Sequence, residues 1–265
     1  MELVKPKVYL IAKTELVNDN VVAWLKDLGG EECLAHITGN DIEQLIELSA
    51  RRCYKSYAPG LNPNVSRVRK DSRVYHDHIL ESGHGSVDEH ASVTFAFENV
   101  SRVTTHELVR HRAGTAMSQE SLRYVRLDNL GFWLPSIFEG DDPNAVASRN
   151  VVMKVLNVCE AAQKELADIW DINNIKSFDT KKELTSAFRR LAPDGLATGI
   201  VFTFNMRALR HVIEKRTSGG AEEEIRLVFG QVAEIMMKEC PYIFGDFEKR
   251  MEKGLYEYVP KYYKV

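Results

Sequence analysis

Long apolar runs and an export signal are both missing from this sequence. A helix that crosses a membrane needs roughly 20 consecutive apolar residues, and no such stretch occurs. The first residues, Met1 to Pro6, lack the apolar core of a secretory signal. We therefore expect a cytoplasmic protein without a membrane partner.

Paired cysteines are missing as well. No Cys-x-x-Cys spacing occurs, which argues against a zinc knuckle or a redox couple, and we expect buried, reduced thiols at Cys33, Cys53, Cys159 and Cys240. Four histidines lie close together between His76 and His90. However, Ser86 stands where an inverted zinc-protease motif ending at Glu89-His90 needs its first histidine. We predict no metal site.

Neither sign of charge dominates the chain. A formal net charge of −3 provides no overall field that would attract nucleic acid, so we expect no nucleic-acid partner and local basic residues around any anionic ligand. Glycine-rich phosphate loops are also absent. Gly83-His84-Gly85 begins a Gly-x-Gly, but Asp88 ends that fingerprint, and no Gly-Lys-Ser/Thr triplet occurs. If a nucleotide binds, side chains must hold it.

The sequence does contain the ingredients of an ordinary globular protein. Of its 265 residues, 44% are hydrophobic and 28% are charged, which suits one main core. We predict a single domain over residues 1–265.

Apolar spacing and turn residues predict strands and helices in mixed order. We expect strands at 7–12, 91–98 and 123–127, loops at 62–65, 84–90 and 113–122, and helices at 20–28, 41–54, 68–81, 102–112, 144–171, 180–191, 195–215 and 220–238. Asn40 or Asp41 caps the helix at 41–54, and Ser101 caps the helix at 102–112. Val93, Phe95 and Phe97 alternate along the second strand and should share its buried face. The tyrosine-rich tail, 256–265, should pack on the body or on a neighbour.

The densest polar segment follows the helix at 102–112. Arg110-His111-Arg112 ends that helix, and Ser118 to Tyr124 continue the segment. On a helix, Glu107 and Arg110 lie about one turn apart and share a face. Arginine suits phosphate because its planar fork donates two charge-assisted hydrogen bonds. A solvated basic helix end explains the pattern equally well.

A second basic set lies far along the chain. It comprises Arg189, Asn205, Arg207, Arg210, His211 and Arg216. On a helix, Asn205 and Arg216 are three turns apart and point to one side, while Ile200 and Phe204 belong to its apolar face. A charged stripe on an amphipathic surface helix explains this set equally well.

Together these segments resemble the flavin-dependent thymidylate synthases. The family hallmark is Arg-His-Arg, seven residues, then Ser-x-Arg-Tyr. Residues 110–112 and 121–124 match both ends, although eight residues separate them here. Further blocks match in the same order: Ala50 to Tyr54, His84 to His90 with Thr94-Phe95, Arg189 to Pro193, Asn205 to Arg207, and Arg216 with Ala221 to Arg226.

The resemblance implies an FAD-dependent methyltransferase. In this family, dUMP becomes dTMP, methylenetetrahydrofolate donates the carbon, reduced FAD donates the hydride, and NADPH reduces the flavin. The classical thymidylate synthase uses a Pro-Cys-His motif, which this chain lacks. The resemblance also implies an α/β (α+β) fold with a mainly antiparallel sheet and long helices. It further implies a homotetramer whose active sites are shared between subunits.

Site residues are carried over by position from this resemblance. The set expected to bind FAD is Ser86, Arg110, His111, Arg112, Gln119, Asn205, Arg207 and His211. The set expected to bind dUMP is Glu107, Arg110, Gln119, Glu120, Ser121, Leu122, Arg123, Arg189 and Arg216. We expect Arg216 to be the catalytic residue, because it would polarise the uracil edge. Glu107 stands where the family has Gln.

Two alternatives remain open. A member of the family that acts on another pyrimidine nucleotide or carbon donor is favoured by the longer spacing after Arg112 and by Glu107. A non-enzymatic nucleotide- or RNA-binding module would use the arginine clusters directly, but the negative net charge and the lack of a contiguous basic patch disfavour it.

Overall fold

The structure is a computed structural model that describes residues 2–124 and 131–263. The chain forms two compact units, and each unit is assembled from separate stretches of sequence. Unit 1 consists of Met1–Val8, Ala96–Arg110 and Met117–Val201. Unit 2 consists of Tyr9–Phe95, His111–Ala116 and Phe202–Val265.

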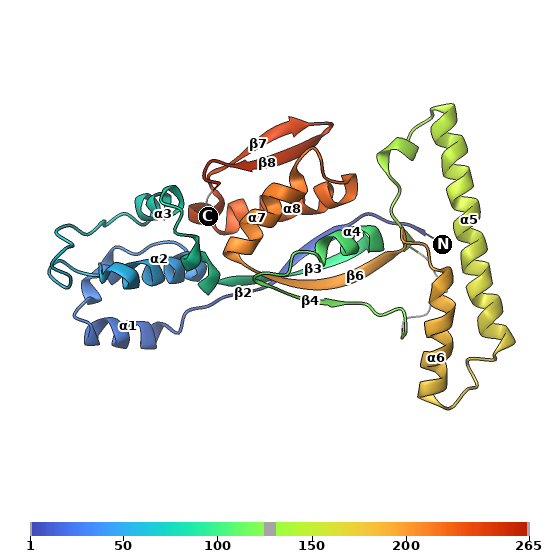
Figure 1. Cartoon of the computed structure of the whole chain (residues 1–265), viewed down its shortest axis with the longest axis horizontal. Coiled ribbons are helices and arrows are strands. Elements are labelled where there is room, and N and C mark those ends of the chain that lie inside the picture. Colours follow the sequence, from blue (N-terminus) through green and yellow to red (C-terminus); the bar gives the residue numbers. More distant parts are fainter. Residues whose placement is uncertain (1, 125–130, 264–265) are drawn as a thin grey trace. The chain divides into compact units, whose positions relative to one another are not determined.

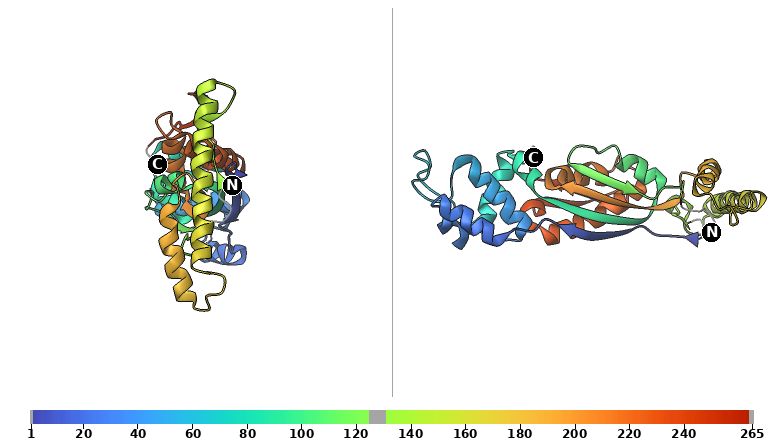
Figure 2. Two further views of the ribbon diagram at one scale, coloured as in Figure 1. Left: turned by 90° about the vertical axis from the view of Figure 1, so that its right-hand side faces the viewer. Right: turned by 90° about the horizontal axis from the view of Figure 1, so that it is seen from below.

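Unit 1 is dominated by two long helices that lie side by side, α5 (Pro143–Ile169) and α6 (Phe178–Phe188) (Figure 1 and Figure 2). Asp142 caps α5 by accepting hydrogen bonds from two backbone amides, and Pro143 fits the first helical position. The buried Gln163 joins the two helices by donating from Nε2 to the Phe188 carbonyl at 2.8 Å. The expected helices at 144–171 and 180–191 are confirmed.

Shorter elements complete unit 1. They are β1 (Glu2–Leu3), which pairs in parallel with β5 (Gly131–Phe132), the helix α4 (Arg102–Leu108), and the 3₁₀ helices η3 (Ser136–Phe138) and η4 (Arg189–Leu191). Ser101 caps α4 as expected, by accepting from the Thr104 amide.

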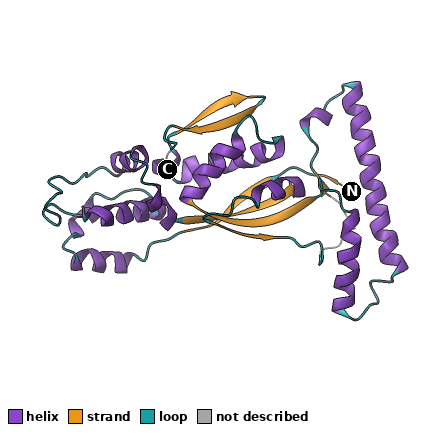
Figure 3. Ribbon diagram, in the orientation of Figure 1, coloured by secondary structure: helices purple, strands orange, loops and turns teal. Residues whose placement is uncertain are grey.

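Unit 2 contains most of the remaining helices. They are α1 (Asn18–Asp27), η1 (Glu31–Ala35), α2 (Asp41–Tyr54), α3 (Ser72–Glu81), η2 (Gly85–His90), α7 (Met206–Thr217), α8 (Glu223–Glu239) and α9 (Pro241–Phe244). Asn40 caps α2, and Glu43 returns the bond in a capping box, so that start agrees with the sequence. The tail forms the hairpin β7 (Phe247–Glu252) and β8 (Leu255–Pro260), which packs on α7 and α8 (Figure 1 and Figure 3).

Four strands form an antiparallel sheet in the order β2 (Lys7–Lys13), β3 (Ser92–Ser101), β6 (Ala197–Asn205) and β4 (Thr115–Gln119). Bonds at both ends of β3 fix its direction against β6. The Met206 amide donates to the Ala91 carbonyl, and the Arg102 amide donates to the Leu196 carbonyl. Each of the four strands contributes residues to both units. The expected mixed fold with an antiparallel sheet is confirmed.

The core of unit 2 contains aromatic side chains from β3, β6 and α8. Phe204 contacts Phe95, Phe202 and Phe229, with ring centroids 6.5, 4.5 and 6.2 Å apart. Val93, Phe95 and Phe97 are all buried, as their alternation along β3 predicts. Among the described residues, none of the helices combines the length and apolarity needed to cross a bilayer.

The expected helix at 195–215 is wrong in its first half. Residues 197–205 form β6, and α7 begins at Met206. Ile200 and Phe204 therefore belong to a strand and not to a helix face. Asn205 ends that strand and caps α7, so it does not lie three helical turns before Arg216. The run of β-branched and aromatic residues in Ile-Val-Phe-Thr-Phe favours a strand, and its pairing on both sides secures it.

Other boundaries differ for local reasons. The helix expected at 68–81 starts only at Ser72, because Asp71 caps it, and α4 ends at Leu108 and not at Arg112. The loop expected at 113–122 contains β4, whose side chains are mostly exposed and so carry no apolar alternation. The loop at 84–90 is the 3₁₀ helix η2. Of the strand expected at 123–127, residues 123 and 124 form a turn, and 125–127 lie outside the described residues.

Two of the four thiols are buried as expected. Cys33 and Cys240 are buried, Cys159 is half-buried, and Cys53 is exposed near the end of α2.

Candidate functional site

His111, the middle residue of the Arg-His-Arg segment, contacts α7 within unit 2. Arg216 donates from Nε to Nε2 of His111 at 2.8 Å, across 105 residues of sequence. Because Nε2 accepts this bond, a neutral His111 carries its proton on Nδ1. The ring of His111 also packs against that of His211, at 6.1 Å and an interplanar angle of 67°. The structure thus brings together the expected catalytic arginine and two residues of the expected FAD set.

The stretch that is one residue longer than the family spacing closes tightly on Asn205. The Asn205 amide donates to the Gly114 carbonyl at 2.8 Å, and its Oδ1 accepts from the Ala208 amide at 2.8 Å. Gly114 has a φ of +67°, and a Cβ at this position would lie 2.4 Å from the Asn205 side chain. Glycine meets both demands, because it adopts a positive φ without strain and carries no Cβ.

The 3₁₀ helix η2 contains Ser86, and it also contains Glu89, which contacts Arg207. Arg207 lies on the first turn of α7 and forms an ion pair with Glu89, with Nη1 and Oε1 2.5 Å apart. Both side chains are about half exposed, 46% and 49%. Ser86 is exposed three residues before Glu89. An exposed pair of this kind contributes little stability, so Glu89 does not hold Arg207 tightly. Sequence reasoning listed Glu89 within a motif but missed this pairing.

Buried charges lie directly beneath this face. Arg210 is 3% exposed and binds both carboxylate oxygens of Asp246, at 2.7 and 2.9 Å. It is therefore a structural residue, although its place in the basic set allowed a ligand contact. Asp88 is 1% exposed, and burial raises its pKa to about 7, against the lowering influence of Arg210 and Arg207. Sequence reasoning missed Asp88, which lies between Ser86 and Glu89.

In unit 1, the expected dUMP segment is anchored between α4 and β6. Gln119 donates from Nε2 to Oγ1 of Thr105 at 3.0 Å. The Glu120 amide donates to the Gly199 carbonyl at 3.0 Å, and the Thr198 hydroxyl donates to the Glu120 carboxylate at 3.4 Å. These bonds hold the backbone that leads into Ser121.

The next residues approach the turn that carries Arg189. Leu122 is buried and packs in a small apolar cluster with Leu196, Cys159 and Ala192. The Ala192 amide donates to the Arg189 carbonyl at 3.0 Å, so Ala192 and Arg189 belong to one turn. Leu122 contacts this turn through Ala192. The oxygen of Ser121 accepts from the Arg123 amide at 3.4 Å, and the Arg123 guanidinium lies 5.8 Å from the ring of Tyr124.

Glu107 and Arg110 depart from the helical arrangement that their spacing predicts. Glu107 is half-buried in the last turn of α4, whereas Arg110 is exposed in the turn that follows Leu108. The shared helix face is therefore wrong. Val103, Thr104, Thr105 and Val109 are β-branched, which weakens a helix in this region.

The expected residues divide between the two units. Ser86, His111, Arg112, Asn205, Arg207, His211 and Arg216 belong to unit 2, whereas Glu107, Arg110, Gln119 to Arg123 and Arg189 belong to unit 1. Within residues 2–124 and 131–263, no three His, Cys, Asp or Glu side chains are grouped to hold a metal ion.

The fold and these clusters define a mixed α+β protein with basic sites suited to anionic ligands. Residues 34–242 match the family model described as "Thymidylate synthase complementing protein". The chain belongs to the family of flavin-dependent thymidylate synthases.

Several relatives support this assignment over nearly the whole chain. The flavin-dependent thymidylate synthase of Mycobacteroides abscessus is 36% identical over 252 residues, covering 93% of this chain and 92% of that protein. The enzyme of Mycolicibacterium gilvum is 35% identical over 255 residues, with coverage of 93% and 92%. The enzyme of Mycobacterium tuberculosis is 33% identical over 247 residues, with coverage of 91% and 90%.

A solved structure shares the fold. The UMP/dUMP methylase PolB from Streptomyces cacaoi, bound with 5-Br UMP, superposes with a TM-score of 0.65 at 18% sequence identity. The match covers 92% of this chain and 95% of that chain.

Proposed function

We propose that this chain is a flavin-dependent thymidylate synthase, a methyltransferase that converts dUMP to dTMP. Methylenetetrahydrofolate donates the carbon, reduced FAD donates the hydride, and NADPH reduces the flavin. Family membership over residues 34–242 is the observation that carries this function. The contact between His111 and Arg216 supports it, because it joins the family hallmark to the expected catalytic arginine.

The side chains of unit 2 fit a flavin dinucleotide chemically. Arg112 is exposed and Arg207 is held only by a surface pair, so two guanidinium forks are available for a diphosphate. Gly114 keeps the backbone close to Asn205, a cradle that any Cβ would fill. We assign FAD to Ser86, His111, Arg112, Asn205, Arg207 and His211, with Arg110 and Gln119 from unit 1. Bound FAD supplies the hydride chemistry, and the protein supplies position and charge.

For dUMP we assign the other set. Arg110, Arg123 and Arg189 offer guanidinium groups for its phosphate, and Glu107 with Gln119, Glu120, Ser121 and Leu122 completes the set. Arg216 polarises the uracil carbonyl and ring nitrogen, which makes ring carbon 5 a better nucleophile without an enzyme thiol. The bond from Arg216 Nε to His111 fixes the plane of the guanidinium for this task.

We further infer that residues 1–265 act as one functional domain in a cytoplasmic homotetramer, without nucleic acid or a membrane as partner. The assigned residues come partly from unit 1 and partly from unit 2, which suits active sites that several subunits share.

One assay tests the proposal. The purified protein, loaded with FAD, is given dUMP, methylenetetrahydrofolate and NADPH, and dTMP is measured by chromatography. We expect dTMP only when all components are present, and flavin absorbance in the purified protein. Replacing dUMP by UMP tests the second candidate, a methylase for another pyrimidine nucleotide, which the longer stretch after Arg112 and Glu107 favour. Turnover of UMP without turnover of dUMP would establish that alternative.

A further inference from the structure

A buried acid lies beneath the residues assigned to FAD in unit 2. Asp88 belongs to η2, between Ser86 and Glu89, and is 1% exposed. The same 3₁₀ helix packs on α7, which carries Arg207 and Arg210. Among the described residues, neither Oδ2 of Asp88 nor Nε of Arg210 has a hydrogen-bond partner. A buried carboxylate without such a partner is costly, so the protonation of Asp88 depends on the charges around it.

The charge that acts most strongly on Asp88 is already paired. Arg210 binds both carboxylate oxygens of Asp246, at 2.7 and 2.9 Å. Burial raises the pKa of Asp88 to about 7, whereas Arg210 and Arg207 lower this pKa and Asp246 raises it. Because Asp246 offsets Arg210 inside the protein, Arg207 is the favourable charge whose influence a ligand can change.

Arg207 connects the surface with the buried acid. It lies on the first turn of α7 and is 46% exposed, and its partner Glu89 is 49% exposed. The guanidinium therefore meets solvent, while its charge acts on the carboxyl of Asp88. An anion that binds at Arg207 adds negative charge where the protein has a cation that favours ionised Asp88.

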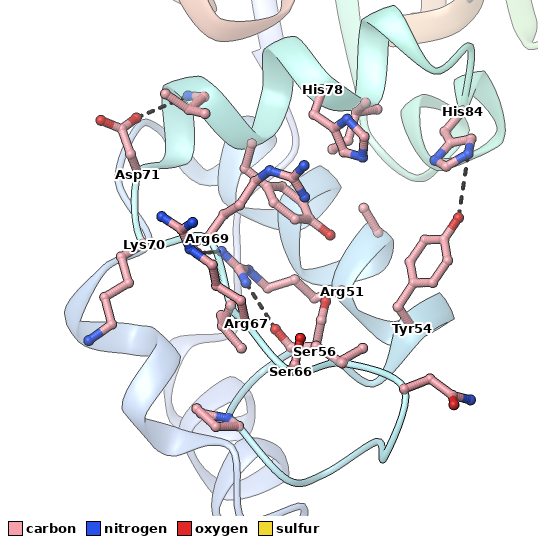
Figure 4. A pocket seen from close by; sticks show the side chains of 18 residues that line it. Arg51, Tyr54, Ser56, Ser66, Arg67, Arg69, Lys70, Asp71, His78 and His84 are labelled. Carbon is pink, nitrogen blue, oxygen red and sulfur yellow. Dashed lines mark hydrogen bonds between the residues drawn. The ribbon is translucent and has the colours of Figure 1, made fainter.

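The helix α2 also packs on η2, and three of its charged side chains are buried. Glu47 and Arg51 pair with each other at 2.6 Å, and Glu43 lies in the capping box at the far end of the helix. At the near end, the hydroxyl of Tyr54 lies 3.5 Å from Nε2 of His84, the residue before η2 (Figure 4). The helix thus supports η2 and leaves α7 and the C-terminal segment to set the state of the buried acid.

We propose that binding of a diphosphate at Arg207 is coupled to the uptake of one proton from solvent by Asp88. The proton moves from water to a carboxylate oxygen of Asp88, and no covalent bond of the ligand changes. This inference rests on the proposed function, because the diphosphate is that of FAD. The coupling is reciprocal, so FAD binds more tightly when Asp88 is protonated.

The direction of the effect follows from the pKa of about 7 in the free protein, which a bound diphosphate raises. Well below pH 7, Asp88 carries its proton with or without the ligand, and binding takes up none. As pH rises through 7, the free protein loses this proton while the complex keeps it, so the affinity for FAD falls. A rise of one pKa unit gives about 0.5 proton per FAD at pH 7.5 and about fivefold weaker binding at pH 8 than at pH 6.

Calorimetric titration of the full-length chain, freed of its flavin, with FAD tests this coupling. Repeating the titration in buffers that differ in ionisation enthalpy counts the protons taken up. We expect Asp88→Asn to lower the uptake at pH 7.5 by about 0.5 proton, because the amide does not ionise. Any contribution from His90, His111 or His211 is common to both proteins. A role of Asp88 in packing alone would leave the proton count unchanged.

A matched variant and a second measurement complete the test. Glu89→Gln removes an exposed carboxylate of the same 3₁₀ helix and should keep the proton uptake. Infrared difference spectra at pH 7.5 should gain the C=O band of a protonated carboxyl group when FAD binds, but not in Asp88→Asn. Tight binding of FAD with equal uptake in the original protein and in Asp88→Asn would overturn this inference alone. Failure of FAD to bind at all would refute the flavin assignment, and this inference with it.

Discussion

The expected site residues of unit 2 and those of unit 1 are held in different ways. In unit 2, side chain contacts side chain: Arg216 binds His111, and His111 packs on His211. In unit 1, Gln119 to Arg123 are held by their backbone and by threonine hydroxyls, and Arg110 and Arg189 are exposed. Unit 2 is therefore preorganised, whereas the arginines of unit 1 become ordered when they meet an anion.

The largest effect should come from the buried pair beneath the unit 2 site. Asp246→Ala leaves the guanidinium of Arg210 buried without its carboxylate, and we expect the free energy of unfolding to fall by about 3–5 kcal/mol. Urea denaturation measures this loss. Glu248→Ala breaks an exposed pair with Arg250 two residues away and should cost at most about 1 kcal/mol. Equal losses in the two variants would contradict the structural role of Arg210.

Next in size is the catalytic effect of Arg216. Arg216→Ala should lower the rate of dTMP formation by about 10²–10³-fold in a tritium-release assay, because it removes a group that polarises the uracil ring. Flavin content should stay unchanged. Lys215→Ala, which alters the exposed neighbouring residue, should leave the rate as it is. Full turnover by the Arg216→Ala variant would refute the catalytic assignment.

The buried carboxyl of unit 2 should make stability depend on pH. Because the pKa of Asp88 is raised to about 7 in the folded protein, the folded state keeps a proton that the unfolded state releases near pH 4. The free energy of unfolding therefore falls as pH rises from about 4 to 7, and this penalty is complete above pH 7. Asp88→Asn removes it, so the gain in the free energy of unfolding should be larger at pH 8 than at pH 5, by at most about 3 kcal/mol.

Two matched comparisons isolate that effect. Burial lowers the pKa of His76 to about 4, so this residue weakens the fold as pH falls below about 6.5, but equally in both proteins. Asp27→Asn, at an exposed position, is the matched control substitution. An Asp88→Asn variant whose gain is the same at pH 5 and pH 8 would contradict the raised pKa.

The smallest effects concern helix caps, one in each unit. Asp142→Ala removes the cap of α5 and Asn205→Ala removes the cap of α7, and each should cost about 1 kcal/mol by thermal or urea unfolding. Only Asn205→Ala should also lower the flavin content. Asp141→Ala, beside the first cap, should change neither quantity. Loss of flavin in both cap variants would contradict a specific role of the α7 cap, in unit 2, in binding flavin.

Local patterns in the sequence were sufficient for several elements. The cap at Asn40, the cap at Ser101, and the alternation of Val93, Phe95 and Phe97 all appear as expected. The motif blocks were sufficient for the family, since residues 34–242 match its model. These features depend on residues a few positions apart or on side-chain type alone.

Two segments misled the same reasoning. Residues 113–119 look like a polar loop because β4 exposes most of its side chains, and only its pairing with β6 makes it a strand. Residues 197–205 fit a helical apolar face as readily as a strand, until both neighbours in the sheet are known. Short segments of this kind take their conformation from partners distant in sequence.

The sequence by itself determined the caps at Asn40 and Ser101, the two long helices of unit 1, the buried face of β3 and the family. Each of these depends on neighbouring residues or on the order of side-chain types. The tertiary structure alone decided that Arg216 binds His111 and that Arg210 forms a buried ion pair with Asp246. It also decided that Asp88 is buried, which raises its pKa. Burial and long-range pairing arise only when distant segments meet, and a linear pattern does not record which segments those are.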